Sequence, residues 1–194
     1  PVVGLVLLPM LLIVMQRETG SALVYLAFFL VLYREGMPGS ILFTGICAVV
    51  YFVVGIRFGQ DFLPDECTPV GEFAVLTLIT LLSAALVFTY CQNKKVVKNL
   101  LLYGLGSIFL SLLFSLYVIP FNVLWVLYGE CVVLVGYLLF LSFRERLMSY
   151  FYIAIFAVGS VVFLYSADYV FDEVLQPHQR IRIEVLLGME EDLA

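Results

Sequence analysis

Charged residues are scarce in this chain. Asp, Glu, Lys and Arg make up 13% of its 194 residues, against about a quarter in an average soluble domain, and 63% of the residues are hydrophobic. A soluble domain of this size needs a largely charged surface and cannot bury so much apolar area. The composition therefore excludes a soluble globular domain and indicates that lipid surrounds most of the chain.

Basic residues, histidine and metal-ligand motifs are also scarce. The chain has 10 Lys and Arg against 15 Asp and Glu, a net charge of -5, which argues against nucleic acid as a partner. It has one histidine and four cysteines, and the cysteine spacing fits no zinc site or disulfide framework. We therefore expect no metal site built from cysteines. Cys47, Cys91 and Cys131 lie in apolar runs, and only Cys67, in a loop, could be reactive.

Processing signals and repeats are missing as well. The first residue is proline rather than methionine, and the first apolar run lacks the basic flank and small-residue cleavage site of a signal peptide. The end of the chain resembles an unfinished loop, and no internal repeat or low-complexity tract is visible. We interpret the chain as a segment of a longer protein.

Long apolar runs are what the chain does contain. A helix needs about 20 apolar residues to cross a bilayer core of roughly 30 Å. Helices are preferred there because lipid offers the backbone no hydrogen-bond partner. The runs predict an all-α, polytopic transmembrane helical bundle over residues 1–172, followed at 173–194 by the start of a large extracytoplasmic loop. The seven expected helices lie near residues 1–15, 21–33, 40–56, 72–91, 100–119, 121–143 and 150–170.

The loops between these runs predict the orientation. If the first helix runs outward, the inner loops hold six of the ten basic residues, namely Arg34, Lys94, Lys95, Lys98, Arg144 and Arg146. Twelve of the fifteen acidic residues then lie outside. Cytoplasmic loops are enriched in Lys and Arg, so this pattern predicts that the loop at 173–194 is extracytoplasmic.

A few charges fall within or near the membrane. The expected helix at 21–33 is too short to span, so Arg17 and Glu18 lie either near membrane depth beside a wet cavity or in an ordinary outer turn. Glu130 is the one charge in the middle of an expected helix. It is either a structural hydrogen-bonding group, bound to a Tyr or Ser of a neighbouring helix, or a functional one.

Two polar clusters are expected on the outer side, at residues 16–21 and 177–192. The second holds Arg180 and Arg182, whose guanidinium groups suit phosphates and carboxylates, followed by Glu184, Glu190, Glu191 and Asp192. Arginines beside carboxylates at an interface suit a phosphorylated lipid substrate, although a solvated acidic loop would have the same pattern. His178 is either a surface or capping histidine or a ligand contact.

The two clusters, in this order, resemble motifs of the SEDS family (shape, elongation, division and sporulation). The run at 16–22, Gln-Arg-Glu-Thr-Gly-Ser-Ala, is similar to the family's Gln-Pro-Asp-Leu-Gly-Ser/Thr. The run at 178–182, His-Gln-Arg-Ile-Arg, is similar to Tyr-Gln-Arg-x-Arg. The run at 186–192, Leu-Leu-Gly-Met-Glu-Glu-Asp, resembles Leu-Leu-Asp-Pro-x-x-Asp-Pro, and the family's catalytic aspartate falls on Asp192.

The chain also departs from the family pattern. Arg17 and Glu18 replace Pro-Asp, Gly188 and Met189 replace the first Asp-Pro, and Leu193 replaces the last proline. The pattern has two membrane helices between the clusters, whereas this chain has six expected ones. The resemblance therefore covers the two ends of the chain better than its middle.

The resemblance implies a membrane glycosyltransferase of the bacterial plasma membrane. Such an enzyme polymerises lipid II, a disaccharide-peptide on undecaprenyl diphosphate, into peptidoglycan for cell elongation and shape, and its partner is a class B penicillin-binding protein. By this resemblance Asp192 is the catalytic base, and the substrate-binding residues are Gln16, Glu18, Gln179, Arg180 and Arg182. A divalent cation could assist the two arginines, and no other cofactor is implied.

Two other functions stay open. A transporter of a lipid-linked precursor would move substrate without chemistry and could use intramembrane charges such as Glu130. A structural scaffold of a wall-synthesis complex would need neither a catalytic base nor a path for substrate across the membrane. The product formed from lipid II discriminates between these functions.

Overall fold

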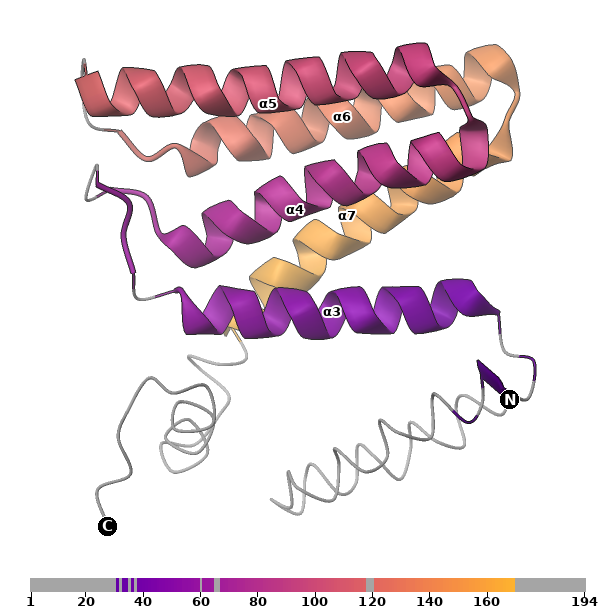
Figure 1. The fold of residues 1–194 in the computed structure, drawn as a ribbon, viewed down its shortest axis with the longest axis horizontal. Helices are drawn as coiled ribbons and strands as arrows, with labels where there is room; N and C mark the ends of the chain where they lie inside the picture. The colour runs from indigo at the N-terminus through magenta and orange to yellow at the C-terminus, as the bar shows by residue number, and fades with distance from the viewer. Residues whose placement is uncertain are drawn as a thin grey trace. The chain divides into compact units, whose positions relative to one another are not determined.

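The part of the chain that the computed structural model describes consists of helices. It comprises residues 31, 33, 34, 36, 38–59, 61–64, 67–117 and 121–169. Its helices are α3 (Gly39–Arg57), α4 (Val70–Leu86), α5 (Lys94–Tyr117), α6 (Leu124–Glu145) and α7 (Met148–Tyr169), as Figure 1 shows. Five helices in this part are long and apolar enough to cross a membrane, which confirms the all-α membrane bundle.

Two of the expected segments lie largely outside the described residues. These are the helices near 1–15 and 21–33, and the loop at 173–194 lies outside as well. The chain divides between Cys47 and Ala48, within α3, into two compact units. The packing described below is that of the second unit.

Backbone hydrogen bonds hold together the two ends of the connection from α3 to α4. Gly71 N donates to Phe58 O at 2.9 Å, and Val70 N donates to Asp61 O at 2.8 Å. A Cβ atom at Gly71 would collide with Gly55 O and would lie 2.9 Å from Gly59 N. Only glycine fits here, because the end of α3 and the start of α4 touch through their backbones.

The connection from α4 to α5 differs from the expected loop. The last turn of α4 widens into a π-helical turn, Val87–Cys91, and Gln92 then takes a left-handed conformation with φ of 50°. Asn93 begins α5 as a cap, because its Oδ1 accepts a hydrogen bond from Val96 N at 3.4 Å. Helix α5 therefore starts at Lys94 rather than near residue 100. The three lysines expected in a loop lie on its first turns, since lysine is a good helix former whose long side chain can reach the membrane surface.

Helices α4 to α7 alternate in direction, and α4 packs against α5, α6 and α7. Figure 1 shows the α4–α5 and α6–α7 connections at one end of the bundle and the α5–α6 connection at the other. At the first end, a hydrogen bond from Asn93 Nδ2 to Tyr150 OH, at 3.5 Å, joins the α4–α5 connection to the first turn of α7. At the opposite end, Val123 N donates to Thr68 Oγ1 at 3.1 Å.

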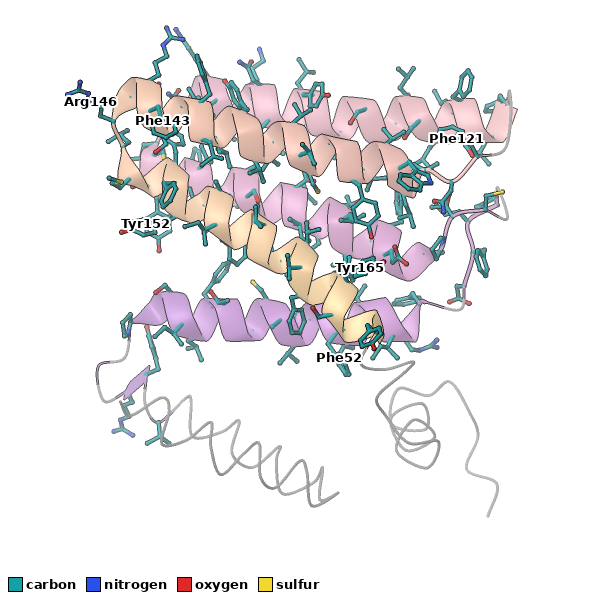
Figure 2. The ribbon with its side chains drawn as sticks, turned by 180° about the vertical axis from the view of Figure 1, so that it is seen from behind. Phe52, Phe121, Phe143, Arg146, Tyr152 and Tyr165 are labelled. Carbon is teal, nitrogen blue, oxygen red and sulfur yellow. The ribbon has the colours of Figure 1, made fainter. Side chains whose placement is uncertain are left out.

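The outer surface of the described helices is rich in apolar and aromatic side chains. Phe109, Leu110 and Val132 are each more than 60% exposed, which suits contact with lipid rather than water. In Figure 2, Phe143 and Tyr152 lie near Arg146 at one end of the bundle. Aromatic rings are enriched at the membrane–water interface, so these side chains mark where the bilayer surface crosses the helices.

Candidate functional site

The residues predicted from the two polar clusters lie outside the described part of the chain. This holds for Gln16, Glu18, Gln179, Arg180, Arg182 and Asp192, and also for Arg17 and His178. Their roles stay predictions. The structure describes the helical bundle of α4 to α7 and the buried polar groups within it.

The described lysines all lie at one end of the bundle, the basic end. Lys94, Lys95 and Lys98 at the start of α5 lie at the same end as Arg144, in the last turn of α6, and Arg146, just after it. At the other end, the described charged side chains are Arg57, Asp61 and Glu72. Helix α7 begins at the basic end and runs away from it to Tyr169. Helix α7 therefore ends, at Tyr169, at the opposite end of the bundle from the three lysines.

Glu130 lies in the interior, where α4, α5 and α6 meet. Its side chain is 4% exposed, and it sits about 9 Å along the axis from Leu124, at roughly 1.5 Å per residue. Ser107 of α5 donates a hydrogen bond to Glu130 Oε2 at 2.8 Å. This contact confirms the hydrogen bond to a neighbouring helix that the sequence predicted for Glu130 in its structural role.

The surroundings of Glu130 are small and close. A Cβ atom at Gly104 would lie 2.7 Å from Glu130 Oε1 and 2.9 Å from the Cγ2 methyl group of Thr80. Glycine at this position therefore makes room for the carboxyl group. Oε1 is buried and has no hydrogen-bond partner. Such an oxygen inside a membrane bundle costs free energy unless a proton or a hydrogen bond satisfies it.

Ser107 links the carboxyl group to the backbone of its own helix. Its Oγ also lies 2.9 Å from Gly104 O, a second acceptor. A hydroxyl group carries one proton and cannot donate fully to both acceptors. If the Glu130 carboxyl group carries a proton and donates it to Ser107 Oγ, Ser107 can donate its own proton to Gly104 O, and no net charge lies in the membrane interior.

A second carboxyl contact, which is half-buried, was not predicted from the sequence. Tyr128 OH donates to Glu72 Oε2 at 3.1 Å, joining the first turn of α4 to α6. The sequence places Glu72 at the start of an apolar run and Tyr128 two residues before Glu130. Nothing in the two runs says that these helices are neighbours, so no sequence signal could have found the pair.

The Glu130 contact predicts a specific pattern of stability. Glu130→Gln should change the free energy of unfolding by less than about 1 kcal/mol, because a neutral amide keeps an oxygen for Ser107. Ser107→Ala should destabilise the protein by about 1 to 3 kcal/mol, because it removes the hydrogen-bond partner of a buried carboxyl group. Unfolding in mixed micelles measures both, with the exposed Glu145→Gln as the control.

If Glu130→Gln destabilised the protein as much as Ser107→Ala does, a charged carboxylate would be required at this position. A structural hydrogen bond would then not explain Glu130.

No cluster of metal ligands appears among the residues that the structure describes. Groups of three or more His, Cys, Asp or Glu side chains that could hold an ion were not found there. Of the cysteines, Cys47 and Cys131 are buried, and Cys67 is exposed in the α3–α4 connection. The divalent cation expected beside Arg180 and Arg182 belongs to residues outside this part, so it stays a prediction.

Comparison with known proteins gives one informative relative. The chain is 29% identical over 187 residues to "Peptidoglycan glycosyltransferase RodA" of Treponema pallidum (strain Nichols). The match covers 96% of this chain and 33% of that protein, so the chain spans about a third of the relative's length. No family model matches the chain. No solved structure matches it either.

The extent of this match bears on the middle of the chain. Because the match covers 96% of the chain, the similarity runs through the described helices. The similarity to RodA is therefore not confined to the ends of the chain, where the sequence motifs lie. It supports a relation to the SEDS family and a membrane location in a multi-pass protein.

Proposed function

We propose that this chain is part of a RodA-like peptidoglycan glycosyltransferase of the bacterial inner membrane. The observation that carries the proposal is the similarity to RodA along 96% of the chain. The motif resemblance at residues 16–22 and 178–192 supports it independently. In this proposal the described helices hold the two polar clusters at one face of the bilayer.

The charge distribution supports an orientation for the bundle. The basic end faces the cytoplasm by the positive-inside rule, since Lys94, Lys95, Lys98, Arg144 and Arg146 gather there. The segment after Tyr169 then starts on the extracytoplasmic side. Lipid II is used on that side, so Arg180, Arg182 and Asp192 would meet their substrate there.

The proposed reaction is a glycosyl transfer. A sugar hydroxyl attacks the anomeric carbon of a second lipid II molecule, a new C–O bond forms, and the bond to the diphosphate breaks. Asp192 accepts the hydroxyl proton, and the lipid diphosphate leaves with the bonding electrons. Arg180 and Arg182 stabilise the charge that develops on the diphosphate. Gln16, Glu18 and Gln179 bind the substrate beside them, and a class B penicillin-binding protein cross-links the product.

A lipid-linked precursor transporter is the second candidate. The buried Glu130 carboxyl group favours it, because charges inside membrane helices often mark transport paths. The short contacts of Glu130 with Ser107 and Gly104 favour a structural role instead. We therefore place the glycosyltransferase first.

Product analysis tests the proposal. The full-length protein is purified with its penicillin-binding partner and incubated with lipid II, and we expect glycan strands that separate by length on a gel. A control reaction with heat-denatured protein should give none. Translocation of lipid II in vesicles without glycan strands would favour the transporter, and neither activity would favour a structural scaffold.

A further inference from the structure

We propose that the basic end of α5 binds an anionic phospholipid, with the headgroup on Lys94 and Lys98 and an acyl chain in the groove beyond them. The groove has a volume of about 610 Å³ and is open along one side. Besides the two lysines, its lining includes Phe88, Val97, Leu101 and Gly106. The site is independent of the proposed glycosyl transfer and involves none of its residues.

The length of the groove matches one leaflet of a bilayer. From Lys94 to Gly106 the groove follows α5 for about 18 Å, at roughly 1.5 Å per residue. Half of a hydrocarbon core of roughly 30 Å is about 15 Å. The groove therefore runs from the membrane surface to near the midplane, which is the space that one acyl chain occupies.

The charge at the mouth of the groove selects an anionic headgroup. Lys94 and Lys98 are four residues apart, so they project from the same face of α5, and both are exposed. The other charged residues described at this end are Lys95, Arg144, Glu145 and Arg146, which leaves a strong excess of positive charge. Basic residues at a membrane surface attract anionic lipids, whereas a zwitterionic headgroup gains little from them.

Gly106 lines the apolar part of the groove and leaves open space beside its backbone. A Cβ atom at Gly106 would meet nothing within 4 Å, so a larger side chain there would occupy the groove without a clash. Leu101 is half-buried and Phe88 is 52% exposed, and both present apolar surface to this space. Covering such an apolar surface with an acyl chain is favourable, because water forms no hydrogen bonds with it.

Lipid association measures the headgroup part of the proposal. The full-length protein is placed in phosphatidylcholine membranes with spin-labelled phosphatidylglycerol or spin-labelled phosphatidylcholine, and the two association constants are compared. We expect the wild-type protein to prefer phosphatidylglycerol. In Lys94→Gln/Lys98→Gln the preference should fall at least about fivefold, the attraction expected from one surface lysine.

A matched variant separates a site from general attraction. Lys95→Gln/Arg144→Gln removes the same charge at the same end but changes no residue that lines the groove, so it should keep most of the preference. Equal losses in the two double variants would show diffuse attraction and overturn the proposal. An unchanged preference in Lys94→Gln/Lys98→Gln would overturn it as well.

The apolar part has its own test. Gly106→Leu should lower the association of both labelled lipids, because the side chain fills the groove. Gly136→Leu on α6 is the control, since Gly136 also has open space around its Cβ position and lies outside the groove. Unchanged association in Gly106→Leu would show that no acyl chain lies there. Binding of a polyprenyl phosphate in preference to phosphatidylglycerol would overturn the choice of lipid.

Discussion

Replacing Asp192 with asparagine is expected to lower the rate of lipid II polymerisation by about 10²- to 10⁴-fold, the usual contribution of a general base. Asparagine keeps the size of the side chain but cannot accept the hydroxyl proton. The full-length variant is purified, and its initial rate of glycan-strand formation is compared with that of the wild-type protein. Binding of lipid II should change far less than the rate.

The control for this variant is Glu184→Gln. It removes a carboxylate from the same segment, at a position with no assigned role, and should leave the rate nearly unchanged. Polymerisation at the wild-type rate in Asp192→Asn would remove Asp192 from the mechanism. Equal losses in both variants would indicate that the acidic segment acts through its overall charge.

Replacing Gly71 with leucine is expected to destabilise the bundle by about 3 kcal/mol or more. Its Cβ atom would collide with Gly55 O and lie 3.1 Å from Gly59 Cα, and backbone atoms cannot rotate away as a side chain can. The hydrogen bond from Gly71 N to Phe58 O would be lost as the helices separate. The free energy of unfolding in mixed micelles, and the yield of folded protein, measure the effect.

Gly136→Leu serves as the comparison for this variant too. Gly136 lies in α6 and has nothing within 4 Å of its Cβ position. Leucine is a better helix former than glycine, so the change should be neutral or stabilise the protein by up to about 1 kcal/mol. If Gly71→Leu were as well tolerated as Gly136→Leu, the backbones of α3 and α4 would not lie in close contact at Gly71.

The helices themselves could be predicted because lipid imposes one strong rule on sequence. A spanning helix needs a long apolar run, so the runs near 40–56, 121–143 and 150–170 correspond to α3, α6 and α7 in the structure. The start of α5 could not be predicted in the same way. Hydropathy shows where apolar residues begin, whereas the helix continues through Lys98 and Lys94 to its cap at Asn93.

For the candidate site too, part of the arrangement could be predicted from the sequence and part could not. A lone glutamate in an apolar helix predicts a polar partner, because an unpaired carboxylate in lipid is costly, and Ser107 is that partner. Which serine or tyrosine would serve was not visible, since that depends on which faces of α5 and α6 meet. The roles of Asp192, Arg180 and Arg182 come from motif resemblance and stay predictions.

The sequence by itself determined that this is a helical membrane protein with six of its ten basic residues near alternate connections, because apolar length and charge act locally along the chain. Only the tertiary structure decided which helices touch, and so paired Tyr128 with Glu72, placed Gly104 beside Glu130 and opened a groove at Gly106. In lipid, apolar faces do not by themselves choose their neighbours. Small residues and buried hydrogen bonds make that choice, and their effect depends on shapes that exist only once the helices have packed.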